Sequence, residues 1–273
     1  MEKVSILILV LAGDTKLSNR NLEVMEETWM KSIPEGIKII KYSGGNTVKY
    51  DGTKLTVNSP DNYESLSFKA LEAFKWVSEN ITFDYIFRTN TSSYVDLENL
   101  KKFCENNTIK HLYRGRVLSN KFNNLSIQWA SGAEILMSKN TFDVLIDKQN
   151  TWNVNLVDDV SIGQILHQNQ ITPANSESVL FDKKFFQKSN LSHEYHIRCR
   201  VDSPFYYPRY IEKYLIRYVH KELHSKNIPY IKRVIYRIFF GVSKIFAITK
   251  HKEYLRHYFW KALKKVFFYK KRT

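Results

Sequence analysis

Residues 85–95 read Tyr-Ile-Phe-Arg-Thr-Asn-Thr-Ser-Ser-Tyr-Val, an apolar run that ends abruptly in small polar side chains. Residues 156–163, Leu-Val-Asp-Asp-Val-Ser-Ile-Gly, pass from apolar to acidic side chains in the same manner. Between them, residues 129–138 read Trp-Ala-Ser-Gly-Ala-Glu-Ile-Leu-Met-Ser, an apolar stretch broken by a Ser-Gly step. Buried strands and core-facing loops deliver polar side chains to a cleft with such patterns. The three segments therefore predict a buried sheet that carries a polar site at its edge.

Strand-like and helix-like segments alternate along the rest of the chain. Apolar runs predict strands that end near 11 and 138 and that span 37–42, 84–88 and 111–117. Helices are expected over 22–30, 96–105 and 158–167 and from 141 onward, with a further helix that begins near Leu66 behind a capping-box pattern of Asp61 and Glu64. Residues 43–46 are expected to form a turn. This alternation indicates an α/β fold with a mostly parallel central sheet flanked by helices.

Charge divides the chain into two parts. The net charge is +15, and residues 230–273 carry 13 Lys and Arg against one acid, whereas the preceding 229 residues carry 29 basic and 26 acidic side chains. We therefore predict a domain over 1–229 and a basic appendage over 230–273, which contains two amphipathic helical patterns. The two cysteines, Cys104 and Cys199, are expected to be free thiols, although one disulfide stays open. The N-terminal apolar run is interpreted as a first strand rather than a signal peptide, and no run reaches the length of a membrane span.

Four short motifs in order resemble the β-1,3-glycosyltransferases of GT-A fold, the galactosyltransferase-type and Fringe-like enzymes. They are Arg20 followed by Glu-Thr-Trp at 27–29, the polar residues after the strand at 85–88, the Ser-Gly step at 131–132 and the Asp-Asp-Val-x-x-Gly pattern at 158–163. The resemblance covers roughly residues 4–200. It implies a GT-A-type fold and an inverting transfer of a sugar from a nucleotide-sugar, with a UDP-sugar as the expected donor.

Two adjacent acids, Asp158 and Asp159, are the candidate catalytic residues. Glycosyl transfer to a hydroxyl needs a base for the acceptor proton, and the resemblance assigns that role to Asp159. The alternative is that both acids only cap the helix that begins there, where the helix dipole favours negative charge.

The segment Asn90-Thr91-Ser92 departs from the related enzymes. They carry aspartates here that hold Mn²⁺ or Mg²⁺, and a hard cation prefers carboxylates to amide or hydroxyl oxygens. The sequence therefore predicts no standard metal site and no cofactor, and leaves open a cation with other ligands. Arg198 and Arg200 are candidates to neutralise the donor diphosphate, and His196 is the candidate for the place of a late histidine that joins the metal in many GT-A enzymes. A surface strand with solvated charges is the alternative for 193–200.

Other donor-site residues follow from the resemblance alone. It places Ser131 and Gly132 beside the donor sugar, and Gly13 and Arg20 near the nucleotide base and pyrophosphate. Together with Asn90, Thr91, Ser92, His196, Arg198 and Arg200, these residues form the expected nucleotide-sugar site.

Residues 230–273 have three interpretations. Basic amphipathic helices suit an anionic membrane surface, which would place the enzyme on the cytoplasmic face of the membrane, building a glycan on a glycan or lipid-linked acceptor. Packing onto the domain or a partner chain is the second interpretation. Nucleic-acid binding is not expected, because the chain lacks a helix-turn-helix, finger or RNA-binding signature. For the whole protein, the alternatives to an enzyme are a catalytically inactive sugar- or nucleotide-binding relative and a membrane-recruited interaction protein.

Overall fold

The computed structural model describes residues 4–107, 109–122, 125–176, 179–180, 195–200, 209 and 212–224. The expected appendage at 230–273 lies outside these residues. The helices are α1 Lys16–Glu27, α2 Leu66–Asn80, α3 Leu97–Asn106, α4 Lys139–Asp147, α5 Asp158–Gln168 and α7 Glu212–His224, with a 3₁₀ turn at Gln149–Thr151. The strands are β1 Ile6–Leu11, β2 Ile37–Gly45, β3 Lys49–Tyr50, β4 Lys54–Asn58, β5 Tyr85–Asn90, β6 Ser93–Val95, β7 Tyr113–Gly115, β8 Val117–Phe122, β9 Leu125–Ala130, β10 Ile135–Ser138, β11 Ala174–Asn175, β12 Val179–Leu180 and β13 His196–Arg198.

Eight strands form the central sheet, in the order β11-β7-β10-β5-β1-β2-β4-β3. Strand β1 pairs in parallel with both β2 and β5, and β2 pairs in parallel with β4, whereas β3 and β10 run antiparallel to their neighbours. The chain moves from β1 to β2 on one side and later returns to place β5 on the other side of β1. The carboxyl ends of β1 and β5 therefore flank a topological switch point, where open α/β sheets bind ligands.

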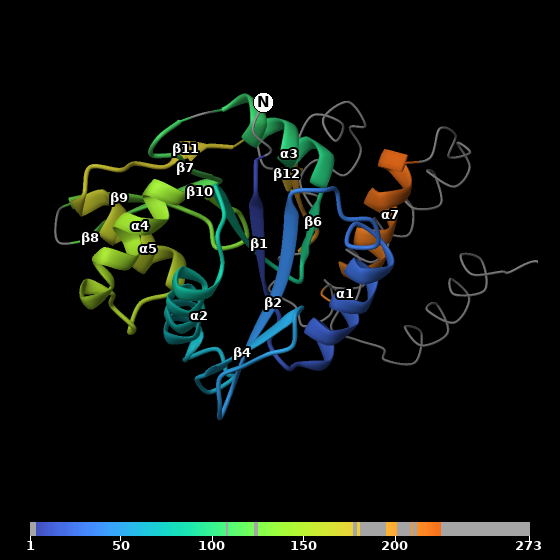
Figure 1. The fold of residues 1–273 in the computed structure, drawn as a ribbon, viewed down its shortest axis with the longest axis horizontal. Coiled ribbons are helices and arrows are strands. Elements are labelled where there is room, and N and C mark those ends of the chain that lie inside the picture. Colours follow the sequence, from blue (N-terminus) through green and yellow to red (C-terminus); the bar gives the residue numbers. More distant parts are fainter. Residues whose placement is uncertain are drawn as a thin grey trace, which may run out of the picture.

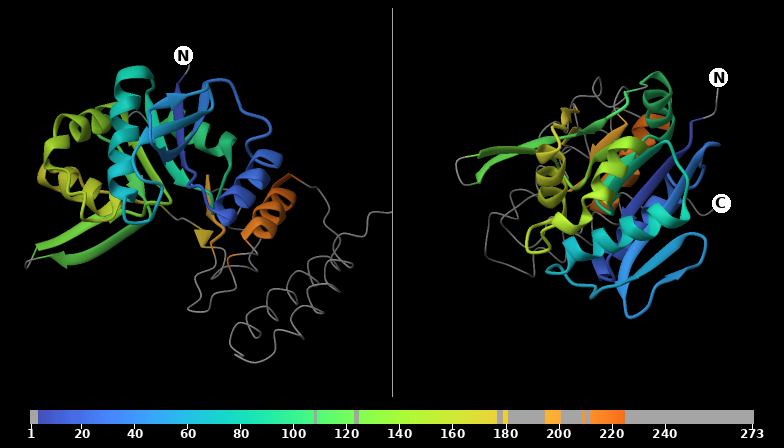
Figure 2. Two further views of the ribbon diagram at one scale, coloured as in Figure 1. Left: turned by 90° about the horizontal axis from the view of Figure 1, so that it is seen from below. Right: turned by 60° about the vertical axis from the view of Figure 1, so that its left-hand side comes forward.

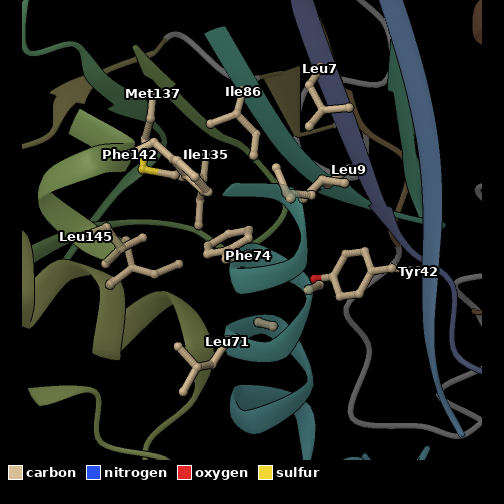
Figure 3. Packing of buried hydrophobic residues seen from close by; sticks show 14 of the residues in the cluster. Leu7, Leu9, Tyr42, Leu71, Phe74, Ile86, Ile135, Met137, Phe142 and Leu145 are labelled. Carbon is tan, nitrogen blue, oxygen red and sulfur yellow. The ribbon is translucent and has the colours of Figure 1, made fainter. Parts of the chain in front are cut away.

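Helices cover both faces of this sheet (Figure 1). On one face α1, α3 and α7 pack against side chains such as Ile8 and Phe87. On the other face α2, α4 and α5 pack against Leu7, Leu9 and Ile86, and Figure 3 shows this second core around Phe74 of α2. Strand β1 is apolar throughout because both its faces are covered. The expected α/β class, with a mixed but mostly parallel central sheet, is confirmed.

Two smaller sheets complete the described structure. Strand β13 pairs with β6 antiparallel and with β12 parallel, which brings residues near 197 against the segment that follows β5. Strands β8 and β9 form a hairpin that extends away from the main body (Figure 2). The single strand expected over 111–117 is therefore wrong in detail, because β7 ends at Gly115 and Val117 already belongs to the hairpin.

Local chemistry explains other differences from the expected elements. Helix α1 begins six residues before the expected position, because the Thr15 side chain accepts the backbone N–H of Ser18 and caps the helix there. The expected turn at 43–46 is wrong, because β2 continues to Gly45 beside β4. The expected capping box of Asp61 and Glu64 is also wrong, because α2 has Ser65 at its N-cap without a side-chain bond. The Asp61 carboxylate has other partners, described below.

The remaining expectations concern the thiols and the membrane. Cys104 and Cys199 are both buried and free, as expected. Burial raises the pKa of Cys104 to about 12, so this thiol is protonated at neutral pH. No helix among the described residues has the length and apolar character needed to cross a membrane.

Candidate functional site

The candidate site lies at the carboxyl ends of β1 and β5. Asn90, the last residue of β5, stands beside Leu11, the last residue of β1, in the parallel register. Helix α1 follows β1 after a short loop, and the Thr91 hydroxyl lies 3.4 Å from the hydroxyl of Ser18 in its first turn. The switch point therefore brings together the end of β5, the loop after β1 and the start of α1.

Below this edge, a buried ion pair joins β5 to α5. The guanidinium of Arg88 contacts the carboxylate of Asp158, and its Nε donates to the Tyr42 hydroxyl at 3.3 Å. All three side chains are buried. Burial by itself lowers the pKa of Arg88, but the attraction of Asp158 and Tyr42 outweighs it, so the pKa is raised and the guanidinium stays charged.

Asp158 is ionised at neutral pH in spite of its burial. The pKa of this carboxyl is raised to about 6, and desolvation is the largest cause. The nearby Asp159 acts in the same direction, while Arg88 and the first backbone N–H groups of α5 lower the pKa. The carboxylate is therefore committed to Arg88 and the helix start.

Asp159 has different surroundings although it is the next residue. It is half-buried, and its Oδ2 accepts the backbone N–H of Gly132 at 2.8 Å. A Cβ atom at position 132 would lie 2.7 Å from Arg88 Nη1 and 3.2 Å from Asp159 Oδ2, so only glycine fits between these groups. The Ser-Gly step and the acid pair, expected from sequence to belong to one site, therefore touch.

The last residue of the Asp-Asp-Val-x-x-Gly pattern has a packing role. A Cβ atom on Gly163 would lie 2.3 Å from Cβ of Trp129, so glycine allows α5 to lie against β9. Trp129 is buried in this contact. This proximity fixes the start of α5, and with it Asp159, relative to the Ser-Gly loop that follows β9.

Asn90 is the centre of a hydrogen-bond cluster at the end of β5. Its Oδ1 accepts the Ser92 backbone N–H at 3.1 Å, the Ser92 hydroxyl at 2.9 Å and Arg198 Nη1 at 3.0 Å. Arg198 reaches this position because β13 pairs with β6 and sets Arg198 opposite Ser93. Asn90 and Arg198 are partly exposed, whereas Ser92 is buried. The structure thus brings together three of the residues expected to bind the donor.

A buried contact between His196 and Glu134 adjoins this cluster through Ser93. His196 Nε2 lies 3.0 Å from the Ser93 hydroxyl, and its Nδ1 lies 3.3 Å from Oε2 of Glu134. His196, Ser93 and Glu134 are at most 1% exposed. The Ser93 hydroxyl in turn lies 3.4 Å from Asn90 Oδ1. His196 therefore meets the site through Ser93 rather than through a surface of its own.

The loop after β1 is held by Asp61. Its carboxylate accepts the backbone N–H groups of Asp14 and Gly44, the latter at 3.0 Å, and pairs with the buried Lys69 of α2. Burial raises the pKa of Asp61, but these donors outweigh it and the pKa is lowered. Asp61 therefore ties Gly13 and its neighbours to β2 and α2 beside the switch point.

Four other expected residues are placed less directly. Thr91 is buried against α1, and Ser131 is half-buried, donating its N–H to the Arg116 carbonyl at 2.8 Å. Arg20 lies on α1 close enough to Tyr214 of α7 to oppose the rise that burial causes in the pKa of that phenol. Arg200 is exposed beyond the end of β13.

The side chains after β5 do not fit a hard divalent cation. No carboxylate lies between Thr89 and Val95, and Asn90 Oδ1 already faces N–H and O–H donors, one of them a cationic guanidinium. Within the described parts of the chain, no group of three or more His, Cys, Asp or Glu side chains is arranged to hold a metal ion.

Comparison with protein families gives one match, the galactosyltransferase family, over residues 49–126. The expected resemblance to this family is confirmed. The matched segment contains β5, Asn90 and Ser92, and it ends before Ser131, Asp158 and Arg198. A comparison with curated proteins found no match.

Solved structures with a similar course of the chain include three glycosyltransferases. One, involved in glycosylation of the major capsid of PBCV-1, shares 9% identity at a TM-score of 0.49 and covers 78% of this chain and 99% of that chain. The galactosyltransferase LgtC, with donor and acceptor sugar analogs, shares 10% identity at a TM-score of 0.45, and the match covers 84% of this chain and 99% of that chain. Apo GlyE from Streptococcus pneumoniae TIGR4 shares 10% identity at a TM-score of 0.43, and the match covers 81% of this chain and 63% of that chain. Likenesses at these TM-scores assign no activity.

Sequence reasoning missed Tyr42, Glu134, Ser93 and Asp61 as parts of the site. Glu134 had a visible signal, because it is an acid inside the apolar stretch 129–138. The local pattern around Asp61 predicts only a helix cap and not its contact with Gly44. Tyr42 had no signal, since a tyrosine at the end of a strand is ordinary core.

Proposed function

We propose that this chain is an inverting glycosyltransferase of GT-A type that moves a sugar from a nucleotide-sugar, a UDP-sugar in the first instance, to a hydroxyl of a glycan or lipid-linked glycan. The galactosyltransferase-family match over residues 49–126 supports the reaction class. The position of the polar cluster at the switch point supports nucleotide binding there. The proposal for the base depends on the contrast between two adjacent acids.

That contrast is the observation that carries the mechanism. Asp158 is buried and paired with Arg88, whereas Asp159 is half-buried and held by the Gly132 N–H through one oxygen. This backbone contact orients the second oxygen of Asp159 for an acceptor hydroxyl. Asp159 is therefore the base, and Asp158 supports the start of α5.

The step is a single displacement. The acceptor oxygen forms a bond to the anomeric carbon as the bond from that carbon to the diphosphate oxygen breaks. The nucleoside diphosphate leaves with the electron pair, and the acceptor proton moves to Asp159. Attack opposite the leaving group inverts the anomeric configuration.

The test begins with calorimetric titration of UDP-, GDP-, CMP- and dTDP-sugars, followed by turnover assays with the donor that binds. Loss of a positioned base costs about 10²- to 10⁴-fold in rate, so Asp159→Asn should nearly abolish turnover and leave donor affinity within about threefold. Asp147→Asn, at an exposed acid near the end of α4, is the matched control and should retain full activity.

Three results would separate the alternatives. Binding without turnover in the unaltered protein would favour an inactive sugar- or nucleotide-binding relative. Full turnover in Asp159→Asn would reject the assigned base. A product that retains the anomeric configuration would reject the single displacement. We further expect turnover to persist in EDTA, because the groups after β5 do not fit a divalent cation.

We also propose that residues 230–273 bind an anionic membrane at its cytoplasmic face. The support is their composition, 13 basic side chains against one acid, together with the two amphipathic patterns. Each Lys or Arg near an anionic surface contributes about 1 kcal/mol, so vesicle binding should weaken with salt. A chain that ends at Asn227 should keep its fold and donor affinity and lose vesicle binding. Unfolding of the shortened chain would show that these residues pack on the domain instead.

A further inference from the structure

We propose that the last turn of α7 and strand β6 form a binding site for a transition-metal ion of the Zn²⁺ class, with His220 Nδ1 and His224 Nε2 as ligands and the Tyr94 hydroxyl as the group that orients them. The third member of this site is a tyrosine, so it differs from a cluster of three His, Cys, Asp or Glu side chains. The inference does not rest on the proposed function, because the ion fixes the end of α7 to β6 and takes no part in sugar transfer.

The two histidines lie on one face of α7. Residues 220–224 read His-Lys-Glu-Leu-His, and side chains at positions i and i+4 of a helix are neighbours. The centroids of the two imidazole rings are 4.5 Å apart. Two histidines with this spacing on one helix bind Zn²⁺ in metalloproteases. The helix therefore presents, in one place, two ligands of the type that Zn²⁺ prefers.

The Tyr94 hydroxyl brings the two ring nitrogens together. Its oxygen lies 3.0 Å from His220 Nδ1 and 3.0 Å from His224 Nε2. A phenol has one proton, so it donates to only one of these nitrogens, and the other must carry its own proton to approach the oxygen. Nitrogens this close to one oxygen atom face the same small volume. A cation there, with metal–nitrogen bonds of about 2.0–2.1 Å, takes a lone pair from both rings at once.

The exposure and charge of the cluster also suit a bound ion. His224 is exposed and His220 is half-buried, which leaves room for water as the remaining ligands. Burial, His224 and Lys31 lower the pKa of His220, and neutral imidazole is the form that binds a metal ion. Burial raises the pKa of Tyr94, so its hydroxyl stays protonated. Lys31 repels a cation here, whereas the charge of Asp96, which acts on Tyr94, attracts one.

The site lies at the end of a helix that is held differently at its start. Glu212, the first residue of α7, accepts a hydrogen bond from Asn21 of α1 at 2.8 Å. The last turn instead reaches β6 through Tyr94 (Figure 1). Because side chains alternate along a strand, Tyr94 points to α7, whereas Ser93 points to His196. An ion on α7 therefore stabilises the fold from the face of β6 opposite to the donor site.

The first experiment titrates Zn²⁺, and separately Mg²⁺, into the full chain by calorimetry after EDTA has been used to strip metals and then dialysed away. We expect saturable binding of Zn²⁺ and none of Mg²⁺, because imidazole ligands suit Zn²⁺ and not a hard cation. His224→Ala should lose one equivalent of bound Zn²⁺. His111→Ala, at an exposed histidine before β7, is the matched control and should bind like the unaltered chain. Zinc binding that His224→Ala leaves unchanged, or no zinc binding by the unaltered chain, would overturn the proposal.

The second experiment measures thermal unfolding with and without Zn²⁺. A ligand that binds only the folded state raises Tm with its concentration, so Zn²⁺ should raise the Tm of the unaltered chain and of His111→Ala but not that of His224→Ala. In EDTA, His224→Ala should still unfold cooperatively, because His224 is exposed, and its lost zinc response is then not a folding defect. A lower Tm of His224→Ala in EDTA, with no zinc response in the unaltered chain, would identify a hydrogen-bond cluster without an ion and overturn the proposal.

The third experiment separates the ligands from the group that orients them. Tyr94→Phe should weaken Zn²⁺ binding about tenfold or more without abolishing it, as loss of an outer-shell partner does. Cu²⁺ prefers the same imidazole ligands, and at one equivalent its EPR spectrum should show two coordinated nitrogens in the unaltered chain and at most one in His224→Ala. Unchanged zinc affinity in Tyr94→Phe would refute the role of the hydroxyl, and identical EPR spectra for the two chains would refute the ligand pair.

Discussion

Two arginines, Arg88 and Arg198, lie close to the end of β5. Arg88 contacts an aspartate oxygen and Arg198 contacts an asparagine oxygen. Arg88 meets the Asp158 carboxylate in the core, where both side chains are fully buried. Arg198 meets the Asn90 amide at the edge of the sheet, where both are partly exposed. The first contact pairs two opposite charges, and the second pairs a charge with a dipole.

The difference between them assigns a role to each. A buried guanidinium must be neutralised, because an unpaired charge in the core costs several kcal/mol. The guanidinium at the edge is partly exposed, so it can contact both the Asn90 amide and a ligand. The Arg88 pair is therefore structural, and the Arg198 pair is the candidate for recognition. The predictions below test this division.

The largest expected effect comes from replacing Arg88. Arg88→Met leaves Asp158 buried without its partner and should lower the free energy of unfolding by about 3–5 kcal/mol. The double variant Arg88→Met/Asp158→Leu removes both charges and should recover most of this loss. Arg198→Met should cost less than Arg88→Met, since the Arg198 side chain is partly exposed whereas Arg88 is buried. Urea unfolding of the variants measures all three values.

The pH dependence of that loss gives a further check. The pKa of Asp158 in the folded protein is already raised to about 6, above the ordinary value of 3.8, and loss of Arg88 should raise it more. A carboxyl whose pKa is higher in the folded than in the unfolded state destabilises the fold at high pH, and protonation relieves it as the pH falls. The Arg88→Met loss should therefore be greater at pH 8 than at pH 5. A loss that grows on acidification would contradict the assignment.

A smaller effect is expected at Gly132, which separates Arg88 from Asp159. In Gly132→Ala the added methyl group would lie 2.7 Å from Arg88 Nη1 and 3.2 Å from Asp159 Oδ2, and such overpacking costs about 1–3 kcal/mol. Turnover should fall as well, because the N–H that orients Asp159 is displaced. Gly13→Ala is the control for stability, since its methyl group would meet only Asp61, at 3.8 Å. Equal thermal stability of the two variants would contradict the packing argument.

The smallest effects compare one hydroxyl from each cluster. Tyr42→Phe removes the acceptor for Arg88 Nε and should lower the free energy of unfolding by about 0.5–1.5 kcal/mol without altering nucleotide affinity. Ser92→Ala removes one donor to Asn90, while the Ser92 backbone N–H still holds the amide oxygen. Nucleotide affinity should then fall by a few fold with little change in stability. The reverse pattern, measured by calorimetry and urea unfolding, would show that the roles of the clusters are exchanged.

The sequence predicted the site better where a motif was local. Asp158 and Asp159 at the start of a helix, Ser131-Gly132 between strands, and Asn90 at a strand end all lie where local patterns placed them. Predictions were weaker where a residue has a distant partner. Asp61 was assigned to the helix that follows it, but its carboxylate binds the loop after β1, which contains Asp14, 47 residues earlier.

The sequence by itself determined the alternation of strands and helices, the polar ends of the buried strands and the absence of carboxylates after β5, because these depend on side-chain type and short spacing. Only the tertiary structure decided which of two adjacent acids is buried, since that follows from Arg88, 70 residues away, and from the close approach of α5 to β9. It also placed Arg198 on Asn90 across 108 residues through the pairing of β13 with β6. Such contacts depend on strand register and helix packing, which a single sequence does not state.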